Sequence, residues 1–302
     1  MAYKISTLIL AAGEGRRLAE VTGGTPKQFW RGPGGRTLLE DTIARFSPLA
    51  PLERMTVVIG RHHRRYVDTG PVELAGTIAE QPADRGTAAG VLLGLTHLPG
   101  EPHEDVVILT PSDHGVADTR GFRRLLVEII RHVQTHDEIV VLGAQPLKAC
   151  SDYGWITPGE AAPAARLRPI ASFVEKPAPE AARRLREAGA AWNTMVVVAR
   201  RASLLGLFAR LLPELYAEFV EAVADRERRP ERLEVVYAAM DRSYDFSRDV
   251  LGQARGLATC ILPASLGWTD LGTPERLRQW HSRLDPTPDG PKDGVEHVVS
   301  AA

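Results

Sequence analysis

The sequence predicts an α/β fold, in which a mostly parallel central sheet carries helices on both of its faces. Strand-like and helix-like segments alternate over the first 145 residues, which is the pattern of consecutive βαβ units. The strand-like segments are largely apolar without alternation, as expected of strands buried on both faces. A length of 302 residues with 44% hydrophobic content is sufficient for a large core.

The first expected strand covers Lys4–Ala11 and leads directly into a glycine-containing loop. The clearest helix is Phe122–Val133, because its apolar residues recur at i, i+3 and i+4 and form one stripe. The other elements expected before residue 145 are the strands Met55–Gly60, Asp105–Asp113 and Glu138–Ala144 and the helix Gly86–Leu98.

After Pro146 the pattern changes to a smaller α+β part over residues 146–283, with more antiparallel strands. Its expected elements are the strands Tyr153–Pro158, Ile170–Pro177, Ala191–Arg200 and Ala258–Ala264, the helix Pro179–Gly189, long helical stretches to about Met240, and a short helix from Pro274. Residues 284–302 are rich in Pro, Gly and Asp, and we expect a mobile tail there.

Composition restricts the possible partners. Lys and Arg total 37 against 38 Asp and Glu, so the basic excess of a nucleic-acid-binding protein is missing. Two cysteines, Cys150 and Cys260, make no disulfide framework, and no Cys/His group has zinc-site spacing. The start of the chain is too short and too interrupted by glycine for a signal peptide or a membrane span. We therefore expect a cytoplasmic protein that binds neither membrane nor nucleic acid.

The segment LILAAGEGRRL, residues 8–18, predicts an anion-binding loop. Gly13 and Gly15 allow close backbone approach to a ligand, and the exposed N–H groups of such a loop suit an anion. Arg16 and Arg17 add forked cationic donors that match phosphate oxygens. The alternative is a tight strand-to-helix turn with solvated arginines. Leu18 replaces the third glycine of a dinucleotide fingerprint, and no Gly-Lys-Ser/Thr of a P-loop occurs.

Further polar side chains follow other predicted strands, where ligands bind in open α/β sheets. Asp113 and Asp270 could together hold one hard cation through carboxylate oxygens. The alternative role for each is that of a capping or turn residue. Lys27 and the pair Glu175–Lys176 are also candidates, with solvated surface groups as the alternative.

Seven segments in order resemble the sugar-1-phosphate nucleotidyltransferase family over residues 4–280, and within it the guanylyltransferases that act on mannose 1-phosphate. The segments are LILAAGEGRRL, TPKQF, QPADRGTAAG, LTPSDH, FVEKP, AWNTM and GWTDLGT. The resemblance implies a Rossmann-like nucleotidyltransferase domain over residues 1–283, with a nucleotide-binding part at 1–145 and a sugar-binding part at 146–283. It implies Mg²⁺-dependent attack of mannose 1-phosphate on the α-phosphorus of GTP, giving GDP-mannose and pyrophosphate.

The resemblance also implies roles for individual residues. Arg17 would contact the triphosphate, Lys27 the phosphates in the transition state, and Asp113 and Asp270 the metal ion. The implied sugar-phosphate residues are Glu175 and Asn193 for the hydroxyls and Lys176 for the phosphate. The implied nucleotide-binding residues are Leu10, Ala11, Ala12, Gly13, Gly15, Arg16, Arg85 and Thr87.

The sequence departs from the family pattern at several positions, among them Arg16 where Thr is usual and Met195 where Gly is usual. One alternative is therefore a nucleotidyltransferase for another pair of NTP and hexose 1-phosphate. Another is a non-catalytic regulatory homologue that binds a nucleotide sugar, although retention of Arg17, Lys27, Asp113 and Asp270 opposes it. The sequence leaves the oligomeric state open, with a homodimer as the assembly considered.

Overall fold

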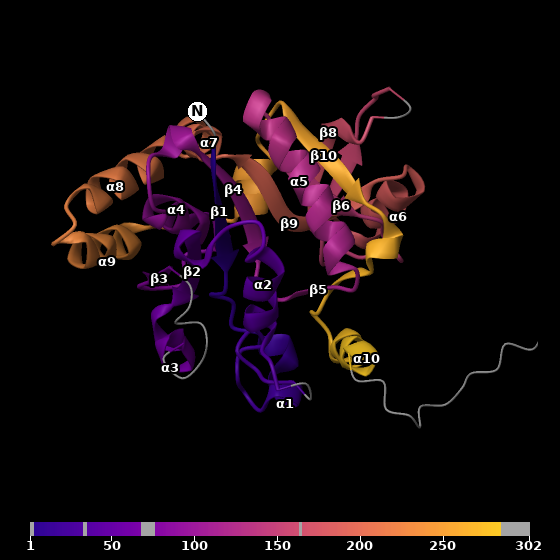
Figure 1. Ribbon diagram of the computed structural model, residues 1–302, viewed down its shortest axis with the longest axis horizontal. Helices are drawn as coiled ribbons and strands as arrows, with labels where there is room; N and C mark the ends of the chain where they lie inside the picture. Colours follow the sequence, from indigo (N-terminus) through magenta and orange to yellow (C-terminus); the bar gives the residue numbers. More distant parts are fainter. Residues whose placement is uncertain (1–2, 33–34, 68–75, 163–164, 285–302) are drawn as a thin grey trace, which may run out of the picture.

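The computed structural model describes residues 3–32, 35–67, 76–162 and 165–284. A large twisted sheet runs through the molecule, with helices packed on both of its faces (Figure 1). The α/β fold predicted from the sequence is therefore confirmed. The predicted mobile tail lies outside the described residues, apart from Leu284, which ends the last helix.

The strands of the large sheet follow the order β3-β2-β1-β4-β9-β6-β10-β8-β7. Their bounds are β1 Lys4–Leu10, β2 Met55–Gly60, β3 Thr77–Gln81, β4 Asp105–Pro111, β6 Ile139–Ala144, β7 Gly154–Pro158, β8 Leu167–Glu175, β9 Ala191–Arg200 and β10 Leu257–Leu262. Two further strands, β5 His114–Val116 and β11 Trp268–Asp270, form a separate antiparallel pair.

Seven strands of the large sheet run in one direction, and β8 and β9 run in the other. The chain therefore builds a parallel half from β1 to β4 and later inserts β9 antiparallel between β4 and β6. As a result, β9 joins the predicted nucleotide-binding and sugar-binding parts within one continuous sheet. The sequence pattern did not predict β3 or the separate β5–β11 pair.

The helices are α1 Ala19–Thr22, α2 Leu38–Phe46, α3 Arg64–Val67, α4 Thr87–His97, α5 Thr119–Thr135, α6 Pro179–Glu187, α7 Arg201–Leu211, α8 Pro213–Ala224, α9 Arg229–Ala239 and α10 Pro274–Leu284. Helix α2, which the pattern did not predict, begins with a capping box. The Thr37 hydroxyl accepts from the Glu40 N–H at 3.1 Å, and the Glu40 carboxylate accepts from the Thr37 N–H at 3.0 Å.

Two hydrophobic cores lie on the two faces of the sheet, because successive strand residues point to opposite sides. Leu8 belongs to the core formed with α4, α7, α8 and α9, whereas its neighbour Ile9 belongs to the core formed with α2 and α5. Helix α5 crosses the sheet near β6 and β10 in Figure 1, and its buried stripe is the one predicted from the sequence. This sandwich fixes the carboxyl edge of β1 and β4, where the candidate site lies.

Truncation of Leu126 tests the core under α5. Leu126 is fully buried in the core beneath this helix, so Leu126→Ala should lower the free energy of unfolding by about 2–5 kcal/mol. Val235 on α9 is 68% exposed, and Val235→Ala should change stability by less than about 0.5 kcal/mol. Chemical denaturation monitored by circular dichroism measures both. Equal effects of the two changes would contradict this assignment of the core.

Candidate active site

The loop that follows β1 is held in place by Gln28. This side chain is buried and donates two hydrogen bonds, to the carbonyl of Ala11 at 2.8 Å and to the carbonyl of Gly13 at 2.7 Å. The N–H of Ala11 donates in turn to the carbonyl of Val58 in β2 at 2.8 Å. The carbonyls of Ala11 and Gly13 are thereby hydrogen-bonded within the protein.

The amide groups of the same loop remain available. Within the described part of the chain, the N–H groups of Gly13, Glu14 and Gly15 donate to no protein acceptor. Gly15 has φ +64°, and a Cβ there would lie 2.9 Å from the backbone nitrogen of Lys27. A side chain at this position would therefore collide with the segment that carries Lys27, so the loop and Lys27 can lie close together only with glycine.

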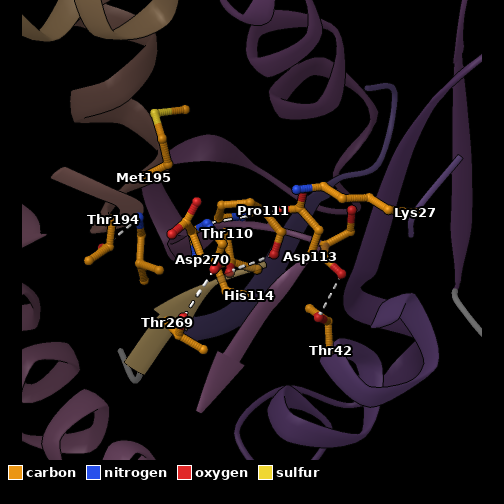
Figure 2. Close-up of polar contacts among 12 residues, drawn as sticks. Lys27, Thr42, Thr110, Pro111, Asp113, His114, Thr194, Met195, Thr269 and Asp270 are labelled. Atoms are coloured by element: carbon orange, nitrogen blue, oxygen red, sulfur yellow. Dashed lines mark hydrogen bonds and ion pairs between the residues drawn. The ribbon is translucent and has the colours of Figure 1, made fainter. Parts of the chain in front are cut away.

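Lys27 and Asp113 form the central ion pair of the site. The Lys27 Nζ lies 2.5 Å from Asp113 Oδ2, and the two side chains are only 16% and 22% exposed. Figure 2 shows the Lys27 side chain reaching toward Asp113. Burial by itself raises the pKa of the Asp113 carboxyl, but the Lys27 ammonium and the nearby His114 outweigh it and hold that pKa below its ordinary value. Asp113 is therefore ionised at neutral pH.

Helix α2 supports the turn that carries Asp113. The buried Thr42 hydroxyl, which points toward this turn in Figure 2, donates to the carbonyl of Ser112 at 3.1 Å. The buried Arg45 guanidinium donates to the carbonyl of His114 at 2.9 Å. These bonds hold the backbone on both sides of Asp113. The carboxylate thus extends from a fixed turn at the end of β4.

Asp270 lies next to Asp113 although 157 positions separate them in sequence. In the β5–β11 pair, Asp270 stands opposite His114, the residue that follows Asp113. Burial lowers the pKa of His114 to about 4, and the negative charges of Asp113 and Asp270 offset this only in part. His114 is therefore neutral at physiological pH, and it connects the two aspartates as the chain neighbour of Asp113 and the strand partner of Asp270.

Asp270 is held by Tyr153 and Arg276. The Tyr153 hydroxyl donates to Asp270 Oδ1, and the Arg276 guanidinium forms an ion pair with the same oxygen. Tyr153 also stacks on Trp192 with ring centroids 4.3 Å apart. Asp270 Oδ2 and Asp113 Oδ1 accept no hydrogen bond from any described residue, so each carboxylate keeps an oxygen for another ligand.

Arg16 and Arg17 are both exposed beside the glycine loop. The Arg17 guanidinium lies 3.5 Å from the Asp152 carboxylate, and one of its nitrogens lies 3.6 Å from the position that a Cβ on Gly272 would occupy. Arg17 therefore faces the turn that follows Asp270. Since this ion pair is largely solvated, it is weak and leaves Arg17 free to contact an anionic ligand.

Glu175, Lys176 and Asn193 form a second group next to this one. Glu175 Oε2 is buried without a hydrogen-bond partner among the described residues, and its Oε1 lies 3.4 Å from Lys176 Nζ. Burial, with added repulsion from Asp245, raises the pKa of the Glu175 carboxyl. A Cβ on Gly154 would lie 2.5 Å from Glu175 Oε2, so glycine is needed at this position for the carboxylate to enter.

Asn193 lies next to Gly154, and its side-chain amide makes two hydrogen bonds within the chain. Its side-chain nitrogen donates to the Ser247 hydroxyl at 3.1 Å, and its oxygen accepts from the N–H of Met195 at 2.9 Å. Met195 has φ +59°, a left-handed conformation that glycine adopts freely. Met195 stands where the family usually has Gly, and its backbone keeps the conformation that Gly favours. A bulge in the β6–β9 pairing lies beside it.

Arg85 and Thr87 lie at the start of α4 and bond to another segment. The Arg85 guanidinium donates to the carbonyl of Tyr237 at 2.9 Å, and the Thr87 hydroxyl accepts from the N–H of Phe246 at 2.8 Å. Leu10 and Ala11 are likewise engaged through their backbone, and Ala12 is partly buried. Of the predicted nucleotide-binding residues, Gly13, Gly15 and the two arginines present the most accessible groups.

Sequence reasoning missed four residues that position the site, namely Gln28, Thr42, Arg45 and Tyr153. Gln28 stands directly after Lys27 in TPKQF, so its proximity to a candidate was the only available signal. Thr42, Arg45 and Tyr153 act through contacts 69 to 117 positions away in the chain. No pattern within their own segments indicates such contacts.

The fold and this arrangement of an open amide loop, an ion pair and two carboxylates define an α/β protein with a polar site at the carboxyl edge of its sheet. Among the described residues, no helix has both the length and the apolarity needed to cross a membrane. The family profile described as nucleotidyl transferase matches residues 6–285. The chain belongs to this nucleotidyl transferase family.

Individual relatives and solved structures agree with this assignment. The chain is 27% identical to the mannose-1-phosphate guanylyltransferase of Salmonella muenchen over 97% of its own length and 62% of that protein. It is 27% identical to the alginate biosynthesis protein AlgA of Pseudomonas putida over 92% of its length and 58% of that protein. The chain thus spans less than two thirds of these curated relatives.

A solved structure from Thermus thermophilus, described as a mannose-1-phosphate geranyltransferase, superposes with a TM-score of 0.79. The two sequences are 28% identical, and the match covers 92% of this chain and 79% of that one. A UDP-glucose pyrophosphorylase complexed with UDP-glucose is 15% identical and superposes with a TM-score of 0.61 over 93% of this chain, a likeness of fold alone. The nucleotidyltransferase fold implied by the sequence is confirmed.

Substitution of Gln28 tests whether it shapes the loop. Gln28→Leu leaves the carbonyls of Ala11 and Gly13 without their donors, so the free energy of unfolding should fall by about 1–3 kcal/mol. The dissociation constant for a nucleoside triphosphate, measured by calorimetry with GTP as the probe, should rise about tenfold, equivalent to about 1.4 kcal/mol. Gln279→Leu on the exposed face of α10 is the matched control and should change neither value. Unaltered stability and GTP affinity in Gln28→Leu would contradict the role.

Proposed function

We propose that this protein transfers a guanylyl group from GTP to mannose 1-phosphate, releasing pyrophosphate and GDP-mannose. The observation that carries the proposal is the convergence of Lys27, Asp113 and Asp270 beside an open amide loop. In this reaction a phosphate oxygen of the sugar phosphate attacks the α-phosphorus in line, and the bond to the β-phosphate oxygen breaks. Such chemistry depends on charge neutralisation and alignment more than on a protein base.

The nucleotide is bound by the loop between β1 and α1. The free N–H groups of Gly13, Glu14 and Gly15 donate to phosphate oxygens, and Arg17 adds a forked cation from the exposed side. Lys27 is mostly buried and already held by Asp113, so its charge needs no reorganisation as negative charge grows on the phosphates. Arg85 and Thr87 border the same part of the site, where they form hydrogen bonds to the segment from Tyr237 to Phe246.

Asp113 and Asp270 would hold Mg²⁺, and their free carboxylate oxygens form the hard donor set that this ion prefers. When bound, the ion neutralises charge on the phosphates. The bonds from Thr42 and Arg45 fix the backbone on either side of Asp113. Tyr153 and Arg276 fix Asp270 from the opposite side.

The sugar phosphate is bound by Glu175, Lys176 and Asn193. The unpaired Oε2 of Glu175 is a buried acceptor that sugar hydroxyls can satisfy, and Asn193 presents an amide beside it. Lys176 provides the charge for the sugar's phosphate group. Tyr153 connects this group to Asp270, because its carbonyl accepts from the N–H of Lys176 while its hydroxyl bonds to the carboxylate.

The choice of guanine and mannose is supported by two Salmonella relatives named mannose-1-phosphate guanylyltransferase. The Thermus structure, described as a mannose-1-phosphate geranyltransferase, supports the sugar phosphate only. The activity is tested by incubating the protein with GTP, mannose 1-phosphate and Mg²⁺ and measuring pyrophosphate release together with GDP-mannose formation. Both products should appear in equal amounts, and neither should form when the sugar phosphate or Mg²⁺ is omitted.

The same assay with other nucleoside triphosphates and with glucose 1-phosphate is the specificity control. Efficient turnover only with a pyrimidine nucleotide would contradict the guanylyl assignment. Turnover with GTP and a hexose phosphate other than mannose 1-phosphate would contradict the sugar. Absence of turnover with every pair would favour a regulatory protein that binds without catalysis.

The shared metal site is tested by a double-mutant cycle. Asp113→Asn and Asp270→Asn should each lower kcat by about 10²-fold or more and raise the Mg²⁺ concentration needed for half-maximal rate. Because residues that act as one unit are not additive, the double variant should be little worse than the poorer single variant. Initial-rate measurements over a Mg²⁺ titration provide these values.

Arg276→Gln is the matched control for this cycle, because it breaks the ion pair with Asp270 and keeps both carboxylates. Because the Tyr153 hydroxyl still donates to Asp270 Oδ1, this variant should raise the Mg²⁺ requirement far less than Asp270→Asn does. If Arg276→Gln reproduces the effect of Asp270→Asn, the role of Asp270 is to form the ion pair with Arg276 and not to bind the metal ion. Additive losses with unchanged Mg²⁺ dependence would show that the two aspartates do not share an ion.

A further inference from the structure

A second group of ligating side chains lies where the glycine loop meets the end of β2. Glu14 comes from the loop, and His62 and His63 come from the 3₁₀ turn Arg61–His63 that follows β2. One ligand atom from each of the three residues lies within 4.8 Å of the others. Glu14 Oε1 is 2.7 Å from His62 Nε2 and 3.9 Å from His63 Nε2. The carboxylate therefore stands between two imidazoles.

His63 is fully buried, and neither of its ring nitrogens makes a hydrogen bond with a described residue. The carbonyl of Ala11 lies near the ring without hydrogen-bonding geometry and already accepts from Gln28. Phe29 packs against the imidazole with ring centroids 5.3 Å apart. A buried polar group without a partner is destabilising, so a ligand that bonds to this ring would remove that cost.

The protonation state of His63 suits a ligand. Burial lowers the pKa of His63 to about 4. The ring is therefore neutral at physiological pH and offers a lone pair, which is the form that binds metal ions.

We propose that Glu14, His62 and His63 bind a divalent transition-metal ion of the Zn²⁺ class. Two imidazoles and one carboxylate are a donor set typical of zinc and its neighbours, whereas Mg²⁺ prefers oxygen ligands. The site thus differs in chemistry from the all-oxygen pair Asp113 and Asp270. Three protein ligands leave a coordination position open to water or another donor.

Such an ion would add ligand bonds between two segments that already meet through the contact of Glu14 with His62. Glu14 lies between Gly13 and Gly15, whose amides remain free, and the histidines are anchored at the end of β2. The bound ion would therefore fix the loop against the sheet edge. Because the ligands belong to the folded arrangement, the ion should also raise the thermal midpoint of unfolding.

Titration of chelator-treated protein with Zn²⁺ tests this site. The titration is done by calorimetry with millimolar Mg²⁺ present, which occupies oxygen-only sites. We expect saturable binding of one Zn²⁺ per chain with an increase in the melting temperature. Co²⁺ should give the visible d–d absorption of a site with nitrogen ligands. His62→Ala and Glu14→Gln should each weaken Zn²⁺ binding by about 100-fold, because each removes a direct ligand. Loss of a residue that only hydrogen-bonds to a ligand already weakens metal binding by about 10- to 100-fold.

His132→Ala is the matched control, because His132 also pairs with a carboxylate, Glu138, at 2.5 Å and is partly exposed. This variant should bind Zn²⁺ as the unmodified protein does. His62 is exposed, so its replacement leaves the fold intact while removing a ligand. The proposal would be overturned if Zn²⁺ binding is not saturable or if Mg²⁺ displaces Zn²⁺. It would also be overturned if His62→Ala and Glu14→Gln bind Zn²⁺ with the affinity of the unmodified protein.

Discussion

The ion pair between Lys27 and Asp113 is the constraint around which the site is built. Two opposite charges that are mostly withdrawn from water remain ionised only if each has its partner and fixed surroundings. The structure supplies them from several directions. Gln28 holds the loop before Lys27, while Thr42 and Arg45 hold the turn around Asp113. Helix α2 thus supports the backbone that carries Asp113.

The sugar-binding side depends on how β7, β8 and β9 meet. Gly154 at the start of β7 makes space for the buried carboxylate of Glu175 at the end of β8. Met195 accepts a left-handed backbone within β9, a conformation that costs a non-glycine residue roughly 1–3 kcal/mol. The bond from its N–H to Asn193 offsets part of this cost and orients that amide. The strained backbone of Met195 thus lies beside the polar side chains of the proposed sugar-phosphate site.

Local patterns were sufficient for most individual elements but not for their arrangement. The stripe in α5 and the apolar runs of β1, β4 and β6 were readable because periodicity and burial leave a direct trace in sequence. Strand β3 and helix α2 were missed, since TIAEQ carries little apolar signal and α2 is short. The insertion of β9 between β4 and β6 could not be read, because pairing partners distant in the chain leave no local pattern.

The sequence by itself determined the α/β class, the open glycine loop and the identity of the charged candidates, because these depend on residue type and near neighbours. Tertiary structure alone decided that Asp270 lies beside Asp113, through the small β5–β11 pair. It also decided that Arg85 and Thr87 bond to the segment from Tyr237 to Phe246 and that Glu14 meets His62 and His63. Each of these depends on the path of the backbone through space, and charges far apart in the chain interact only once packing of the two cores has brought them together.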